Sequence, residues 1–189
     1  MLFHDLGTAR LLLKNISKDD TDFVFREFSD DSVNKYLFDT EPFVNRKEAE
    51  DLIDFYLRPE PRAQHRWILI KKDTGEKIGT CGFHGWDMIS RACEVGYDLT
   101  KEYWGHGYMS EALRAILSFA RAEMNVQTVN ACISVDNQRS IALVQNQGFI
   151  FSGQKIYLRF REAEYEHYIF TYISEGDKHS NLQNTDRRA

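Results

Sequence analysis

The sequence predicts an α/β domain built on a mixed, largely antiparallel β-sheet. Segments with strand-like alternation occur along the whole chain, whereas strands alternate with helices only in its second half. A length of 189 residues, with 42% hydrophobic and 13% aromatic content, suits one domain with a sizeable core. We therefore expect one domain over residues 1–174. The polar tail at 175–189 is expected to be disordered.

The first half of the chain contains signals for helices, strands and a hairpin. The elements expected there are a strand at 10–15, helices at 18–28 and 46–56, and strands at 65–71 and 77–86. Ser17 or Asp19 is suited to begin the first helix, and Pro59 and Pro61 interrupt the pattern after the second. The turn at 73–76, which contains a glycine, joins the last two strands into a hairpin.

The second half alternates strands and helices more regularly. The elements expected there are strands at 92–99 and 128–135, helices after each of them, and strands at 151–160 and 165–174. In the first strand, the odd-numbered residues from Cys93 to Leu99 share one face, and Glu94, Gly96 and Asp98 share the other. The residues at 136–140 suit the start of a helix that Gly148 ends.

A glycine-rich turn lies between the strand at 92–99 and the helix that follows. The segment 103–109 reads Tyr-Trp-Gly-His-Gly-Tyr-Met. Glycine permits close backbone approach to a ligand, and the first amides of a helix have no intrahelical acceptors. Such a turn can cradle a pyrophosphate, although a Gly-x-Gly before a helix is more often only a tight turn.

This turn and its flanking elements resemble the GNAT superfamily of acetyl-CoA-dependent N-acetyltransferases. The family's phosphate loop, Arg/Gln-x-x-Gly-x-Gly/Ala, lies over residues 104–109, with Gly107 at its middle glycine. Trp104 replaces the leading residue, as in the ribosomal-protein N-terminal acetyltransferase branch (RimJ/RimL type), and Met109 replaces the closing small residue. The segments at 8–13, 42–43, 78–83 and 137–149 are similar to the same branch, so the resemblance covers residues 8 to about 174.

The resemblance implies a sheet of six or seven strands, about four flanking helices, and acetyl-CoA as cosubstrate. In that fold the strands at 92–99 and 128–135 run parallel and splay apart, which opens a slot for the pantetheine arm. The residues expected to bind the coenzyme are Gly96, Tyr97, Asp98, Leu99, Trp104, Gly105, His106, Gly107, Tyr108, Met109, Ser110, Asn137 and Ser140. Asn137 and Ser140 are also preferred residues at helix starts, so helix capping is the competing interpretation.

Attack of a neutral amine on a thioester requires a proton acceptor, oxyanion stabilisation and a proton for the leaving thiolate. Glu94 is the candidate base, acting directly or through a water, because we expect its carboxylate to be partly desolvated; a structural ion pair is the equal alternative. The resemblance implies backbone amides near Tyr97 for the carbonyl and Ser140 near the sulfur. Tyr157 is an alternative acid. His84 is set aside because it can simply point outward.

The resemblance predicts an enzyme that acetylates a primary amine, with a protein N-terminus as the acceptor that the branch suggests. Small amines such as polyamines, antibiotics or amino acids remain open, because acceptor specificity depends on the loops at 29–45 and 56–66 and on the hairpin at 157–168. Two other hypotheses are a non-catalytic acyl-CoA sensor and an α/β domain whose glycine loop is only a turn.

Composition narrows the remaining expectations. The net charge of −5 includes no basic stretch, so nucleic-acid binding is not supported. No long apolar run or signal-peptide pattern is visible, which makes a cytoplasmic protein without a membrane partner the default. The three cysteines lack metal-site spacing and are expected to be buried thiols, with no metal. Monomer and homodimer are both open, since an unpaired terminal strand at 165–174 would suit a dimer.

Overall fold

This computed structural model describes residues 2–38 and 40–174, so the tail predicted at 175–189 lies outside the described residues. The strands are β1 (Leu6–Gly7), β2 (Leu11–Asn15), β3 (His65–Lys71), β4 (Lys77–Asp87), β5 (Ala92–Leu99), β6 (Thr128–Ser134), β7 (Ile150–Phe160) and β8 (Ala163–Ile173). The α-helices are α1 (Thr21–Ser29), α2 (Asp31–Asn34), α3 (Arg46–Tyr56), α4 (Tyr108–Ala122) and α5 (Gln138–Asn146), with short 3-10 turns η1 (Lys18–Asp20) and η2 (Lys101–Tyr103).

The described strands form one eight-stranded sheet in the order β1-β2-β3-β4-β5-β6-β8-β7. Neighbouring strands are antiparallel except β5 and β6, which run parallel. The predicted α/β class with a mixed, largely antiparallel sheet is therefore confirmed. The sheet has one strand more than expected because the two-residue β1 pairs with β2, and α2 is an additional short helix.

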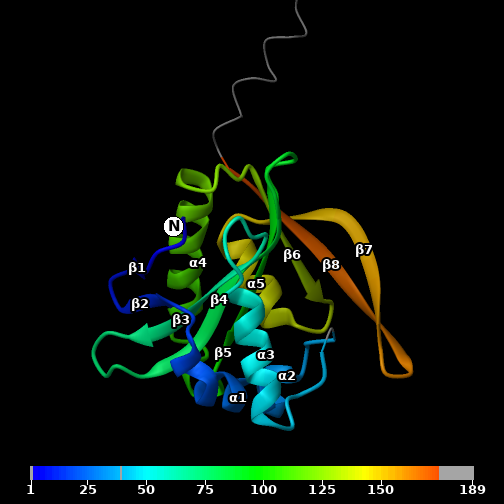
Figure 1. The fold of residues 1–189 in the computed structure, drawn as a ribbon. Helices are drawn as coiled ribbons and strands as arrows, with labels where there is room; N and C mark the ends of the chain where they lie inside the picture. The colour runs from blue at the N-terminus through cyan, green and yellow to red at the C-terminus, as the bar shows by residue number, and fades with distance from the viewer. Residues whose placement is uncertain (1, 39, 175–189) are drawn as a thin grey trace, which may run out of the picture.

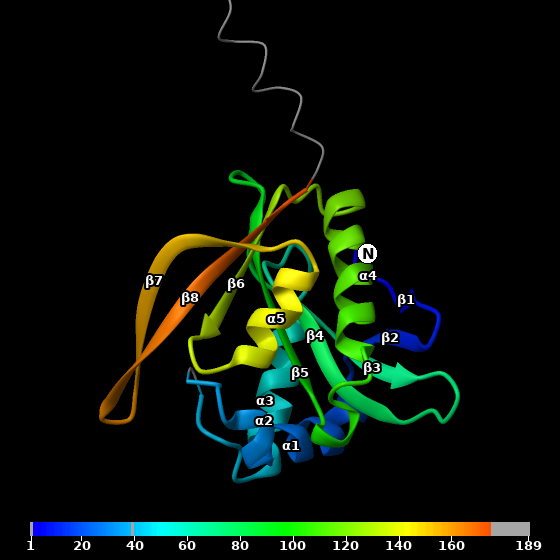
Figure 2. The same cartoon turned by 180° about the vertical axis from the view of Figure 1, so that it is seen from behind.

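Helices cover both faces of the sheet, and each face has its own core (Figures 1 and 2). On one face α4 packs on β2 to β6, and this larger core includes all four residues predicted to share a face of β5, from Cys93 to Leu99. On the other face α1 and α3 form a smaller core with Ile16 and Ile68. The alternation in the sequence of β5 therefore predicted correctly which of its residues face this core.

Local capping explains why several helices begin and end where they do. The Asn45 side chain accepts from the Glu48 amide at the start of α3, and the Asn137 side chain accepts from the Ser140 amide at the start of α5. Gly148 follows α5 with φ of +90°, a left-handed conformation that glycine adopts without strain. The helix expected at 18–28 is instead η1 followed by α1.

The hairpin of β7 and β8 stands out from the body of the sheet (Figure 1). The prediction that the strand at 165–174 is an unpaired edge is wrong, because β8 pairs with β6 on one side and β7 on the other. The tip of the hairpin meets the segment between α2 and α3: the Phe38 ring stacks on Tyr165 with centroids 3.9 Å apart, and Glu41 pairs with Arg161 at 2.6 Å.

Candidate active site

The parallel strands β5 and β6 pair over only three residues and then separate. The last paired residues are Glu94 and Asn130, whereas β6 continues to pair with β8 as far as Ser134. Figure 2 shows the two strands diverging. The segment 95–99 of β5 therefore has no partner strand on the β6 side, and this separation of the two strands, called the opening below, is the splaying that was expected.

The glycine loop follows β5 and ends at the first residue of α4. Gly105 and Gly107 have φ of +79° and +77°, and Gly107 is the residue before the helix. A Cβ built on Gly105 meets nothing within 4 Å, so the side-chain direction there is open. Met109 is buried in the main core, as the sequence predicted, and does not fill the loop. The helix N-terminus with its free amides therefore remains exposed to an anion.

Two arginines that the sequence did not single out flank this loop. Arg10 donates from Nη1 to the His106 carbonyl at 3.0 Å, and its Nε pairs with Glu111 at 2.6 Å. Arg139 lies over the Trp104 ring, 4.7 Å from its centroid. Both residues are far from the loop in sequence, so only the packing of β2 and α5 against the loop reveals them. Together they place two guanidinium groups beside the loop, of which that of Arg10 is already paired with Glu111.

A pair of hydroxyls spans the opening between β5 and α5. The Tyr97 hydroxyl is hydrogen-bonded to Ser140 Oγ. Burial raises the pKa of Tyr97 to about 12, against the lowering effect of that hydrogen bond. The Asn137 carbonyl oxygen caps α5 by accepting from the Ser140 amide at 3.1 Å. Capping and coenzyme binding are compatible here, because the Asn137 amide group keeps its two donors.

Other residues expected to bind the coenzyme already take part in internal contacts. The Leu99 carbonyl accepts from Trp104 Nε1 at 2.6 Å, and Ser110 Oγ accepts from Gln147 at 2.6 Å. The His106 ring is exposed and lies 2.9 Å from the Trp104 carbonyl. Tyr108 packs under the Arg10 guanidinium. These contacts hold the loop in shape and leave its backbone amides as the groups that face a ligand.

The candidate base and the alternative acid are both exposed. The expectation that Glu94 is partly desolvated is wrong, since its side chain is exposed and its cross-strand neighbour is His84. Tyr157 is 61% exposed on the edge strand β7, and its cross-strand neighbour is Glu166. The hydroxyl that the structure brings to Ser140 is that of Tyr97.

Asp98, predicted as a coenzyme residue, instead points into a buried polar cluster under α1. Arg66 donates to Asp98 at 2.9 Å and to Thr80 at 2.7 Å, with both charged side chains under 10% exposed. Glu27 lies beside them and accepts from Thr100 at 2.6 Å. A side-chain contribution of Asp98 to the coenzyme slot is therefore excluded by this geometry, and only its backbone lies along β5.

Burial raises the pKa of the Glu27 carboxyl to about 8, and repulsion by the Asp98 carboxylate adds to the effect. The second Glu27 oxygen, Oε1, is buried without a hydrogen-bond donor among the described residues. A proton on that oxygen, donated to Asp98, satisfies both carboxyl groups. The raised pKa of Glu27 therefore favours its protonated form at neutral pH.

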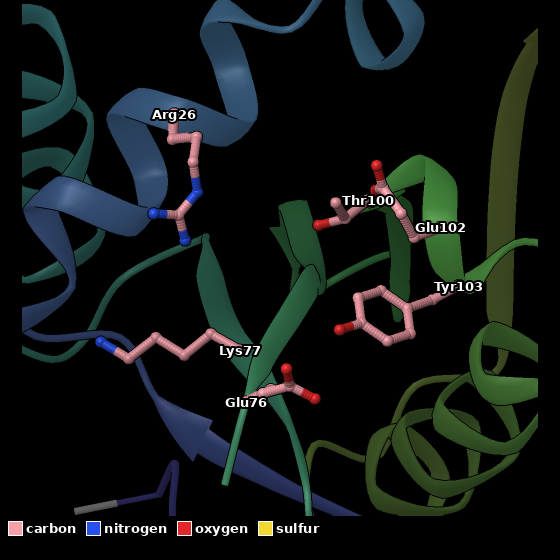
Figure 3. A pocket seen from close by; sticks show the side chains of 6 residues that line it. All are labelled: Arg26, Glu76, Lys77, Thr100, Glu102 and Tyr103. Carbon is pink, nitrogen blue, oxygen red and sulfur yellow. The ribbon is translucent and has the colours of Figure 1, made fainter. Parts of the chain in front are cut away.

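A cavity of about 380 Å³ opens beside this cluster, between α1, the start of β4 and η2 (Figure 3). Arg26 and Tyr103 reach toward it from opposite sides, and Thr100 lines its wall. None of the residues predicted to bind the coenzyme lines it. It is thus separate from the opening between β5 and β6.

The described residues form neither a metal-binding cluster nor a membrane-spanning helix. In the described ranges no group of three or more His, Cys, Asp or Glu side chains is arranged to hold a metal ion. None of the helices there is long and apolar enough to cross a membrane. Cys81 and Cys93 are buried thiols and Cys132 is partly buried, and burial raises the pKa of the first two.

Comparison with known proteins places the opening and the loop in a family context. Residues 10–150 match the model of the acetyltransferase (GNAT) domain. An uncharacterized N-acetyltransferase of Bacillus licheniformis, p20, is 35% identical over 150 residues, which are 78% of this chain and 83% of p20. The ribosomal-protein-serine acetyltransferase of Escherichia coli is 28% identical over 87 residues, which are 46% of this chain and 48% of that protein.

Among solved structures, the spermidine N-acetyltransferase of Vibrio cholerae, crystallised with CoA and spermine, has the same fold. It superposes with a TM-score of 0.78 at 17% sequence identity and covers 87% of this chain and 96% of its own. Similarity at that level of identity establishes the architecture, whereas the acceptor has to be argued from this chain's own residues.

Proposed function

The chain belongs to the GNAT acetyltransferases and is an acetyl-CoA-dependent N-acetyltransferase, and on that premise we propose that its acceptor is the N-terminal amine of a protein or peptide. The separation of β5 and β6 next to the glycine loop supports the coenzyme part of the proposal, and the pairing of carboxylates described below supports the acceptor. It gives one continuous path for a coenzyme and leaves the face with α1 and α3 for an acceptor. The finer assignment to the RimJ/RimL-like branch is part of the same proposal.

In this proposal the pantetheine arm lies along the open edge of β5 at 95–99, and the pyrophosphate lies on the amides of residues 105–110. Backbone donors at a helix N-terminus favour anions, and Arg10 and Arg139 add positive charge at the rim. Asn137 donates to the pantetheine arm while its oxygen caps α5. The whole domain, residues 1–174, takes part in this arrangement.

The chemistry that we propose is direct attack in a ternary complex. The amine nitrogen attacks the thioester carbonyl, whose developing oxyanion accepts hydrogen bonds from the backbone near Tyr97. The nitrogen loses its proton toward the side of β5 that carries Glu94. The thiolate receives a proton from the Tyr97 and Ser140 hydroxyls, which are already hydrogen-bonded to each other. Tyr157 stays a secondary candidate, because its exposed place on β7 requires the acceptor to cover it.

Three carboxylates on the acceptor side are already paired, which supports a peptide over a polyamine in this proposal. A polyamine carries two or more cationic groups and requires carboxylates that are free to pair with them. The carboxylates of Asp98, Glu41 and Glu166 instead pair with Arg66, Arg161 and Lys155. A peptide N-terminus brings one amine and a neutral backbone, which the same surface accommodates.

The competing assignment is a small amine, and the comparisons include a relative of each kind. The E. coli protein is named for ribosomal-protein serine and the V. cholerae protein for spermidine. A panel assay of thiol release from acetyl-CoA distinguishes them. We expect turnover with peptides of free N-terminus and none with the same peptides blocked at the N-terminus. Turnover with spermidine but not with peptides would move the protein to the small-amine class.

A non-catalytic acyl-CoA sensor is the second candidate, and Gly107→Asp separates it from a wrong loop assignment. The aspartate places a carboxylate at the proposed pyrophosphate position, so calorimetric titration is expected to show CoA affinity weakened at least ten-fold. Glu102→Asp, an exposed residue just before the loop, is the matched control. Unchanged CoA binding by Gly107→Asp would mean that the loop is only a turn. The cytoplasmic location and the absence of nucleic-acid and membrane partners stay predictions from the sequence.

A further inference from the structure

His84 lies over Gly96, at the point where β5 loses its partner strand. A Cβ built on Gly96 would come within 2.5 Å of His84 Nε2 and 2.9 Å of Cε1. Real Cβ atoms do not approach so closely, so a larger residue at position 96 would require the His84 imidazole to move. The Nε2 edge of the ring therefore lies directly over Gly96, which follows Glu94 on the same face of β5.

The imidazole is held from three elements. Its Nδ1 lies 3.4 Å from the Tyr56 hydroxyl of α3, Arg66 Nη2 of β3 lies 3.3 Å from the same built Cβ on Gly96, and Glu94 of β5 is its cross-strand neighbour. A histidine whose Nδ1 donates to Tyr56 presents an unprotonated Nε2 at Gly96. No hydrogen bond to Nε2 is found among the described residues.

We infer that His84 is the group that accepts the proton from the attacking amine, with Tyr56 fixing its tautomer and Glu94 passing the proton to solvent. The inference rests on the proposed acetyl transfer. The nitrogen lone pair forms the new C–N bond and the carbonyl electron pair moves to oxygen. An N–H proton of the resulting ammonium goes to His84 Nε2. The oxyanion then re-forms the C=O bond, the C–S bond breaks with its electron pair on sulfur, and the sulfur takes one proton from the Tyr97 and Ser140 pair. Solvent then returns a proton to the Tyr97 and Ser140 pair, which matches the proton that Glu94 passes to solvent.

The electrostatics supply the required protonation state. Burial lowers the pKa of the His84 imidazole to about 4, and the positive charge of Arg66 acts in the same direction. The ring is therefore neutral at pH values above that pKa, and the same shift makes it a weaker base than an ordinary imidazole. An ordinary histidine would be half protonated near pH 6.5.

The first test removes the imidazole. We expect His84→Ala to lower kcat by about 10²- to 10⁴-fold, the usual contribution of a general base, with acetyl-CoA affinity unchanged and partial recovery by added imidazole. The drop is expected to exceed that of Glu94→Gln. His4→Ala, which removes an exposed histidine elsewhere, is the matched control and is expected to stay within two-fold. A folded His84→Ala variant with wild-type kcat would overturn the inference.

The second test displaces the imidazole without removing it. Gly96→Ala introduces the methyl group that collides with Nε2, and its effect on kcat is expected to be at least ten-fold in wild type. In the His84→Ala background the same change is expected to have little further effect, because the collision is gone. Equal effects of Gly96→Ala in both backgrounds would show that Gly96 matters for another reason and would count against His84.

The third test needs no acceptor and so separates failure of this inference from failure of the proposed acceptor. In ¹⁵N spectra of the folded protein with acetyl-CoA alone, His84 is expected as the Nδ1–H tautomer, with its Nε2 signal shifted by the coenzyme. If that signal shifts but no amine is acetylated, the acceptor proposal fails while the position of His84 stands. If His84 is the Nε2–H tautomer, or does not respond to acetyl-CoA, the inference is wrong.

Discussion

Glu94 and Asp98 share one face of β5 and yet have opposite surroundings. Glu94 is exposed, whereas Asp98 is buried against Arg66 and close to Glu27 of α1. Alternation in the sequence predicted the shared face, because strand geometry fixes it. It did not predict the burial, because that depends on where α1 packs, and helix position is a tertiary property.

Glu94→Gln tests the residue that the sequence selected as base. We expect kcat to fall about ten-fold with little change in acetyl-CoA affinity, because the amide keeps the shape of the side chain and cannot take up a proton. Steady-state kinetics from pH 6 to 9 with calorimetry check this. Glu50→Gln, on the exposed side of α3, is the control. Unchanged turnover at every pH would remove Glu94 from the proton path.

Glu27→Gln tests the buried proton. Because the folded-state pKa of Glu27 is raised to about 8, its contribution to stability is present below pH 4.5 and is lost as pH rises to 8. Gln keeps the hydrogen bond from Thr100 and donates to Asp98 without a titrating proton. In urea unfolding, the free energy of unfolding of the wild type is expected to fall with pH by up to about 1.4 kcal/mol per pH unit between pH 6.5 and 8. Glu27→Gln is expected to lose this fall.

Two buried histidines determine how the stability changes on the acid side of the same experiment. Burial lowers the pKa of His65 to about 3 and that of His84 to about 4. Their contribution is present above pH 6.5 and is lost as pH falls, so stability is expected to decrease below pH 6.5 in both the wild type and Glu27→Gln. If Glu27→Gln keeps the wild-type dependence of the free energy of unfolding on pH above pH 6.5, Glu27 is ionised in the folded protein.

Among the elements, the hairpin of β7 and β8 departs most from what the sequence predicts. Its strands were predicted close to their observed ranges, but not that β8 lies inside the sheet and β7 at its edge. Strand order depends on long-range pairing, which alternation within one strand does not encode. The start and end of α5 were readable, because Asn137 and Gly148 act on their own neighbours in the chain.

Phe38→Ala tests whether the contact between this hairpin and the segment before α3 shapes the acceptor site. Loss of the Phe38 stack on Tyr165 is expected to raise the KM for a peptide acceptor several-fold, while the KM for acetyl-CoA stays the same. Arg161→Ala, which removes an exposed ion pair and a cation–π contact with Phe160 but leaves the Phe38 stack, is the control and is expected to have an effect under about five-fold. A rise in both KM values would indicate general loosening of the fold.

In the whole molecule, one sheet carries both cores and the separation of β5 and β6 next to the glycine loop. The order of strand, glycine loop, helix, strand and helix identified the fold because each part is local in sequence. The cations around the loop and the imidazole on Gly96 were not predicted, since Arg10, Arg139 and His84 reach the site from separate elements. The surface that we propose for the acceptor likewise forms only when α1 to α3 and the hairpin come together.

The measurement that most directly tests the account is mass spectrometry of one peptide that contains both a free α-amine and an internal lysine, incubated with the protein and acetyl-CoA. We predict a single acetyl group on the α-amine, no acetyl group on the lysine, and no product with the Gly107→Asp variant. Acetylation of the lysine alone, or of spermidine in preference to the peptide, would contradict the proposed acceptor.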